Sequence, residues 1–180
     1  MIVGGRPLTE SKEIEIVDVK NQGRLCSVQA KFPIEVGYAS GGAFSDFGLV
    51  HCGGYKSNVG VTNQCYHLGR NAKFEEKLTL KTGRYLASSV TTPNGTFIVI
   101  GGEDSNHNDL ATLEIIDTVK GEILAEQELD ETIRDHCSVV LNDTTIFIMG
   151  GFQSGSRSRK TFYIDLKTFK THKYGENREN

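Results

Sequence analysis

The sequence predicts an all-β fold made of about four copies of one repeated unit, and three observations support this. A Gly-Gly pair occurs four times, with first glycines at positions 4, 53, 101 and 150, so the spacings are 49, 48 and 49 residues. Each pair ends a short apolar run, such as residues 97–100. A second apolar run with β-forming residues follows in each repeat. A period near 50 residues with this content is typical of a β-propeller.

The strands of each repeat are expected in a fixed order. A strand of small residues comes first, as at 85–90, and the strand that ends in Gly-Gly comes second. Asn94-Gly95 between these two strands is a strong hairpin signal. The third strands are expected at 14–18, 64–68, 114–117 and 162–165, and an outer strand near 73–75. We place the four repeats at residues 1–33, 34–83, 84–133 and 134–175.

The glycine pairs are expected to have a structural role. They are Gly4, Gly5, Gly53, Gly54, Gly101, Gly102, Gly150 and Gly151. Glycine takes positive φ and allows close approach of a neighbouring backbone. We therefore expect each pair to let the chain leave its sheet beside the crowded centre of the ring.

The pattern resembles the kelch repeat. The resemblance rests on the last three glycine pairs, on Tyr66 and Tyr163 downstream of them, and on Arg84 and Arg134 before the first strands. It covers essentially the whole chain and implies a kelch-type β-propeller. Kelch repeats usually carry a Trp in the outer strand, whereas this sequence has none, and Phe74 takes that place in the second repeat.

A kelch ring usually has more than four blades, and the first repeat begins inside its second strand. We therefore expect about three complete four-stranded blades and one partial blade in an incomplete ring. The chain is expected to be a fragment or to complete its ring with another copy. Open strand edges recruit other strands, so we also expect self-association.

The cysteines leave several alternatives open. Cys52 and Cys65 are expected on neighbouring antiparallel strands, where they could form a disulfide, remain buried thiols, or bind a metal together with His67. Cys26 and Cys137 have no partner that the sequence indicates. Cys137 aligns with Ala87 in an inner strand, where a small buried residue is expected.

The segments 32–42, 52–55 and 65–66 resemble secreted kelch-repeat proteins of invertebrate animals. That resemblance implies a bridge between Cys52 and Cys65 within one blade, and a secreted protein. Two glycosylation sequons, at Asn94 and Asn142, lie at equivalent hairpin tips and favour the same compartment. A cytoplasmic adaptor of cullin-type ubiquitin ligases is the alternative.

The composition and the motifs narrow the range of functions. The net charge is −3, which does not favour nucleic-acid binding, and no apolar run reaches the length of a membrane helix. We find no catalytic constellation, metal site or cofactor motif. His51 is expected in a strand and His136 near the start of another, and both are expected to be packing or capping residues and not bases. We therefore expect no enzymatic activity, with a galactose-oxidase-like enzyme as the alternative.

The loops between second and third strands vary while the repeat frame is constant. The third loop is acidic, with Glu103, Asp104 and Asp109, and the fourth is basic, with Arg157, Arg159 and Lys160. In a propeller these loops share one face of the disc, which suits a binding surface on a rigid scaffold. We therefore expect a protein-interaction module whose unidentified partner binds these loops.

Overall fold

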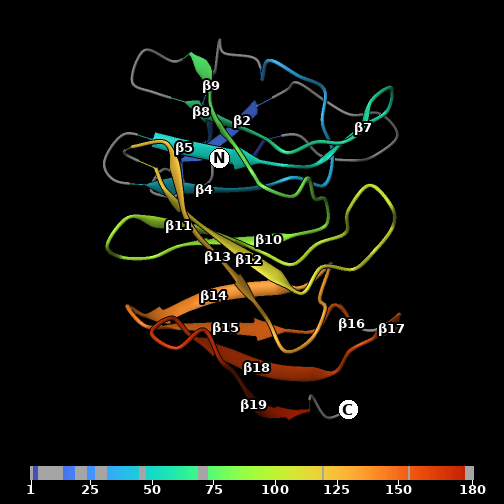
Figure 1. Cartoon of the computed structure of the whole chain (residues 1–180). Helices are drawn as coiled ribbons and strands as arrows, with labels where there is room; N and C mark the ends of the chain where they lie inside the picture. Colours follow the sequence, from blue (N-terminus) through green and yellow to red (C-terminus); the bar gives the residue numbers. More distant parts are fainter. Residues whose placement is uncertain are drawn as a thin grey trace.

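The computed structural model describes residues 2–3, 14–18, 24–26, 32–44, 48–68, 73–118, 120–153 and 155–176, and these residues form strands and loops without any helix (Figure 1). The first sheet contains β1 (Ile2–Val3), β2 (Ile14–Asp18) and β3 (Arg24–Cys26). Three four-stranded antiparallel sheets follow it. The second contains β4 (Ser40–Phe44), β5 (Gly48–Cys52), β8 (Gln64–Leu68) and β9 (Phe74–Thr79).

The third and fourth sheets repeat this order. The third sheet contains β10 (Ser88–Thr91), β11 (Thr96–Ile100), β12 (Thr112–Asp117) and β13 (Glu122–Glu128). The fourth contains β14 (Cys137–Asn142), β15 (Thr145–Met149), β18 (Lys160–Asp165) and β19 (Thr171–Glu176). Two short ribbons, β6 (Tyr55–Lys56) with β7 (Gly60–Val61) and β16 (Phe152–Gln153) with β17 (Ser156–Arg157), fill the loops after two of the glycine pairs.

The predicted strands are therefore present, with one shift at the inner strand of the third repeat. The sequence predicted a strand over 85–90, whereas β10 begins at Ser88. The preceding Leu86 has a φ of 54°, and the equivalent Tyr38 and Asp135 have φ values of 54° and 55°. A left-handed residue at this place interrupts the extended chain, so the ladder starts only beyond it.

The second, third and fourth sheets are stacked in succession, with β4, β10 and β14 side by side (Figure 1). Apolar residues on alternate positions fill both junctions. Phe97, Val99 and Ile116 of the third sheet pack against the second sheet, whereas Ile98, Ile100 and Leu113 pack against the fourth. The third sheet is therefore buried on both faces.

The connecting segments repeat at the level of single hydrogen bonds. Gly54 donates its N–H to the carbonyl of Arg84 at 2.8 Å, and Gly102 donates in the same way to Ile133 at 2.8 Å. Arg84 and Ile133 are therefore equivalent positions of two repeats. Leu86 likewise donates to Tyr38 at 3.0 Å and Asp135 to Leu86 at 2.8 Å, so the third sheet is tied to the second and the fourth to the third.

The glycine pairs sit where the chain passes the next connecting segment. Gly101 has a φ of 58°, and a Cβ there would lie 2.0 Å from the carbonyl oxygen of Ile133. Gly150 has a φ of 66°, but a Cβ there would meet no described atom within 4 Å. At position 101, glycine is therefore required both for the left-handed backbone conformation and for the close approach of Ile133. At position 150, it is required for the left-handed conformation. Gly4 and Gly5 lie outside the described residues.

Cys137 is exposed, which corrects the expectation of a buried position. It pairs with Met149 as Ser88 pairs with Ile100, so it aligns with Ser88, one residue away from the predicted alignment with Ala87. Its face of the fourth sheet also carries the exposed Val139 and Leu141. The described residues leave this face uncovered, so a small residue there is not buried by a neighbouring sheet.

Candidate functional site on the loop face

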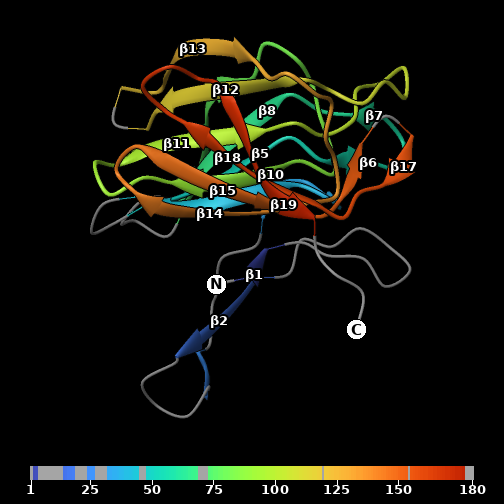
Figure 2. The same cartoon turned by 90° about the horizontal axis from the view of Figure 1, so that it is seen from below.

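The loops that follow the glycine pairs lie on one side of the molecule. The ribbons β6–β7 and β16–β17 are both at the right in Figure 2, opposite the tip that joins β14 to β15. The loop of residues 103–109 belongs to the same series, since Glu103 bridges to Tyr85 as Tyr55 bridges to Gly37. We call residues 55–61, 103–109, 152–153 and 155–160 the loop face.

Glu103 is the centre of a polar cluster on this face. Its Oε1 accepts hydrogen bonds from the Tyr85 hydroxyl and from Nδ1 of His107, the latter at 2.7 Å. Its Oε2 lies 3.2 Å from Nε of Arg134, which also donates to Oδ1 of Asp109 at 2.5 Å. The Glu103 side chain is only 8% exposed, whereas that of His107 is 77% exposed. The carboxylate is thus buried beneath groups that reach the surface.

The contacts of the cluster determine the protonation of Glu103 and Tyr85. Burial acts to raise the pKa of Glu103, but hydrogen bonds from Tyr85 and His107 and the charge of Arg134 together lower it. Burial and the hydrogen bond to the Glu103 carboxylate raise the pKa of Tyr85 to about 12. Glu103 is therefore an anion and Tyr85 a neutral donor at physiological pH.

Aromatic side chains surround this cluster. The Tyr85 ring lies 5.8 Å from that of Tyr55 and 6.3 Å from that of Tyr38, measured between centroids. The guanidinium carbon of Arg134 lies 4.7 Å from the centre of the Phe152 ring. Three successive repeats thus contribute rings, and the charge pair lies between them.

The acidic residues predicted for the third loop have internal partners. Glu103 and Asp109 share Arg134, as described above. Asp104 closes its own turn, because its Oδ1 accepts the backbone N–H of Asn106 at 2.8 Å and of Asn108 at 2.9 Å. These bonds lower the pKa of Asp104. The third loop is therefore held in one conformation by its acids, a role for which the sequence alone gave no signal.

The basic residues of the fourth loop differ in their contacts. Arg157 in β17 and Arg159 are exposed. Lys160 is partly buried, and its Nζ lies 3.0 Å and 3.2 Å from the two carboxylate oxygens of Glu131. Arg157 and Arg159 therefore present positive charge at the surface, whereas Lys160 joins the fourth sheet to the segment before it.

Cys52 and Cys65 form a disulfide, with a Cα–Cα distance of 4.1 Å. They are cross-strand partners of β5 and β8, and both are buried. Of the three alternatives left open by the sequence, the structure has the bridge. In the described residues, no group of three or more His, Cys, Asp and Glu side chains is arranged to hold a metal ion.

His51 in β5 and His136, just before β14, are both largely shielded from solvent. His51 is buried against Phe32, with ring centroids 4.3 Å apart, and neither ring nitrogen has a hydrogen-bond partner among the described residues. Nε2 of His136 lies 2.5 Å from the Ser88 hydroxyl, and its Nδ1 is buried. Burial lowers the pKa of each to about 4. Both are therefore neutral packing residues.

Asn94 and Asn142 are exposed at the hairpin tips. In each sequon, Oδ1 accepts the backbone N–H of the Thr two positions later, at 3.3 Å for Thr96 and 2.9 Å for Thr144. Both side chains lie on the side opposite to the loop face, since these turns connect the first and second strands of a sheet. A glycan at either position would leave the loop face open.

The fold defines a class of all-β proteins in which four-stranded antiparallel sheets follow one another. The solved structure of YjhT is similar to this chain, with a TM-score of 0.76 and 14% sequence identity, over 97% of this chain and 68% of that one. At this identity the likeness shows a shared fold. No family model matches the sequence, and no curated protein matches it significantly. Within the described residues, no helix could span a membrane.

Proposed function

We propose that the chain is a portion of a kelch-type β-propeller that binds a protein partner through its loop face. The observation that carries the proposal is the hydrogen-bonded Tyr85–Glu103–Arg134 cluster, flanked by rings from three repeats. Tyr and Arg dominate the binding energy of protein interfaces because they combine large area with polar groups. Their preorganisation here reduces the conformational entropy lost on binding.

Binding is proposed in preference to catalysis because of the electrostatics of Glu103. Its carboxylate is engaged by three side chains and its pKa is lowered, so it is a weak base and is not protonated for acid catalysis. Its contacts suit the positioning of Tyr85 and Arg134. An adaptor of cullin-type ubiquitin ligases remains compatible with a binding face, since such an adaptor also acts by holding a partner.

Site-specific crosslinking tests this proposal. A photo-crosslinking amino acid at Tyr55 should give one saturable crosslinked protein in material from the natural source. The same group at Asn94, on the opposite side, should not. Reversal of charge by Arg157→Glu should reduce the Tyr55 crosslink without lowering the melting temperature, because Arg157 is exposed. Equal crosslinking from Tyr55 and Asn94 would contradict a loop-face interface.

We further propose that the protein is extracellular. The buried Cys52–Cys65 bridge supports this, because disulfides persist in oxidising compartments. The exposed sequons Asn94 and Asn142 agree with it. Mass spectrometry of the natural protein should find the bridge intact and a glycan at either Asn. Free thiols at Cys52 and Cys65 after denaturation without reductant would indicate a cytoplasmic protein.

We also propose that the protein associates with itself through the uncovered face of the fourth sheet. Val139 and Leu141 are 45% and 58% exposed there, and Tyr174 is 73% exposed. An open cavity of about 470 Å³ lies between Leu141, Phe147 and Tyr174. Sedimentation should show concentration-dependent dimers or larger species, and Leu141→Glu should reduce them. A monomer at all concentrations would contradict the proposal.

A further inference from the structure

The segment between the third and fourth sheets can be aligned residue by residue with the one before it. Arg84 and Ile133 are equivalent through their bonds from Gly54 and Gly102. Leu80 and Leu129 are equivalent as well, because each follows the outer strand of its sheet and donates its N–H at 2.7 Å to the residue directly before the third strand, Asn63 and Ala111 respectively. Counting from these anchors, Lys81 and Thr82 correspond to Asp130 and Glu131.

In the earlier junction a buried carboxylate binds this segment. Glu114 is fully buried, and it accepts the backbone N–H of Lys81 at 2.8 Å and that of Thr82 at 3.2 Å. Its Oε1 also lies 2.6 Å from the Arg84 guanidinium. The two consecutive N–H groups of the segment thus form a binding place for a carboxylate.

In the later junction that carboxylate is missing. Glu114 corresponds to Phe162, because Leu113 pairs with Ile100 as Thr161 pairs with Met149. Ile133 stands where Arg84 stood. Among the described residues, no hydrogen bond is donated by the backbone N–H of Asp130 or Glu131. The repeat has therefore kept the donors and lost the acceptor.

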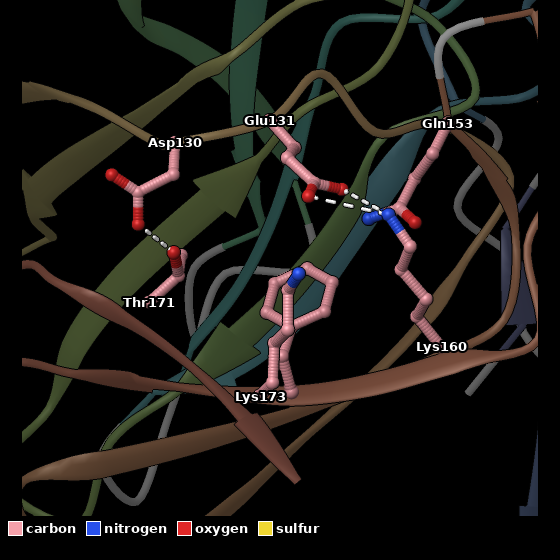
Figure 3. A pocket seen from close by; sticks show the side chains of 7 residues that line it. Asp130, Glu131, Gln153, Lys160, Thr171 and Lys173 are labelled. Atoms are coloured by element: carbon pink, nitrogen blue, oxygen red, sulfur yellow. Dashed lines mark hydrogen bonds and ion pairs between the residues drawn. The ribbon is translucent and has the colours of Figure 1, made fainter. Parts of the chain in front are cut away.

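A pocket lies at this place (Figure 3). It has a volume of about 120 Å³, and Phe162 lies in its wall between the two sheets. It is lined by Asp130, Glu131, Gln153, Lys160, Phe162, Thr171 and Lys173. Gln153 is buried, and Lys160 belongs to the fourth loop, so the pocket adjoins the loop face.

Two carboxylates and two lysines line the pocket, and Glu131 is paired with Lys160. Asp130 accepts a hydrogen bond from the Thr171 hydroxyl. No described acidic group forms an ion pair with Lys173, whose amine reaches into the pocket in Figure 3. An entering anion would therefore meet the Lys173 amine and the two N–H groups, with the Asp130 carboxylate at the edge of the same pocket.

We propose that this pocket binds a carboxylate group, which takes the place that Glu114 occupies in the preceding junction. The backbone N–H groups of Asp130 and Glu131 donate to it, and Lys173 supplies the charge. A cavity of this volume admits a carboxylate with one or two carbon atoms, such as the end of an acidic side chain or a chain terminus. The inference deepens the proposed function, because it names the group that a partner would present beside the loop face.

Titration of the labelled protein with sodium acetate, followed by ¹⁵N–¹H NMR, tests the pocket without any partner. The amide signals of Asp130 and Glu131 should move downfield and saturate. Acetamide and sodium chloride at the same concentrations should not reproduce the shifts. Unsaturated drift, or equal shifts with acetamide, would overturn the proposal, whereas the crosslinking experiment at Tyr55 could still succeed.

Two lysine variants separate a specific contact from general charge. Lys173→Gln should weaken acetate binding roughly two- to fivefold, as expected for loss of an exposed charge contact. Lys170→Gln removes the same charge from an exposed position outside the pocket and should leave the binding unchanged. Equal effects of the two variants would show that acetate responds only to net charge and would overturn the role of Lys173.

Discussion

The two sheet–sheet junctions of this protein share one backbone frame but are filled by opposite chemistry. Between the second and third sheets, Arg84 and Glu114 form an ion pair with no exposed side-chain surface. Between the third and fourth, the same positions hold Ile133 and Phe162, which belong to an apolar cluster. The comparison shows that the backbone frame depends on the glycine turns and the backbone hydrogen bonds, and that it is compatible with either an ion pair or apolar side chains in the junction.

The two fillings should respond differently to substitution. The guanidinium of Arg84 donates to the carbonyls of Gly101 and Thr112 at 3.0 Å and 3.1 Å, so it also binds the exit of the third sheet. Removal of one partner of a buried pair leaves an uncompensated charge, whereas replacement of both by apolar groups is often neutral. Loss of one partner of the ion pair should therefore cause most of the destabilisation possible at the earlier junction. At the later junction, the loss of stability should increase with the apolar volume removed.

The largest effect is expected for Arg84→Met. It leaves the Glu114 carboxylate buried without its cation, which should lower the free energy of unfolding by about 3–5 kcal/mol. Urea denaturation followed by circular dichroism measures this. The double variant Arg84→Ile with Glu114→Phe copies the later junction and should recover most of the loss. A loss below about 1 kcal/mol for Arg84→Met would contradict the comparison.

Gly101→Ala should come next, at about 2–4 kcal/mol, from left-handed strain together with displacement of Ile133. Gly150→Ala, at the equivalent place in the next repeat, meets no described atom and should cost about 1 kcal/mol from the backbone alone. The melting temperatures of the two variants measure the difference. Equal losses would mean that the junction does not restrict Gly101.

Reduction of the Cys52–Cys65 disulfide should lower the free energy of unfolding by about 3 kcal/mol, by the loop-entropy estimate for a loop of this size. The equivalent pair in the third sheet is Ile100 with Leu113, which packs without a bridge. Denaturation with and without reductant gives the value. Because both sulfurs are buried, native-state reduction should be slow; fast reduction would indicate local opening of the second sheet.

The smallest effect is expected at acidic pH, which should lower the free energy of unfolding through the later junction. The pKa of His136 in the folded state is about 4, below the unfolded value of 6.5, so its stability contribution is full above pH 6.5 and is lost as the pH falls toward 4. At pH 5.5 the loss should be about 1 kcal/mol. His136→Ala, which copies Ala87 of the earlier junction, should reduce this pH dependence. An unchanged dependence would assign it to His51, whose pKa is lowered to the same extent.

Much of the fold was predictable because the repeat is marked by glycines and turn residues that require particular backbone conformations. The glycine pairs and the apolar runs after them located the second and third strands of all four repeats, and Asn94-Gly95 located one hairpin turn. The start of β10 was missed because Leu86 takes a left-handed conformation, which is rare for a leucine and which the sequence does not indicate. The alignment of Cys137 was wrong by one residue, although the 49-residue spacing of Gly101 and Gly150 places it opposite Ser88.

The candidate sites were less predictable, because their contacts join residues far apart in the sequence. Arg134 was noted as part of the repeat, but its pairing with Glu103 and Asp109 depends on how two repeats meet. Arg84 and Glu114 are 30 positions apart. A useful signal was available: both are charged where the aligned residues Ile133 and Phe162 are apolar, and a matched pair of departures from a repeat indicates contact.

The position of the disulfide also has a consequence for biosynthesis. Cys52 and Cys65 are 13 residues apart and face each other across one hairpin, so the bridge requires nothing from the third or fourth sheet. Oxidation can therefore occur while residues 88–176 are still being translated. The second sheet would then be covalently closed before its neighbour arrives, and it would offer a finished apolar surface on which the third sheet can fold.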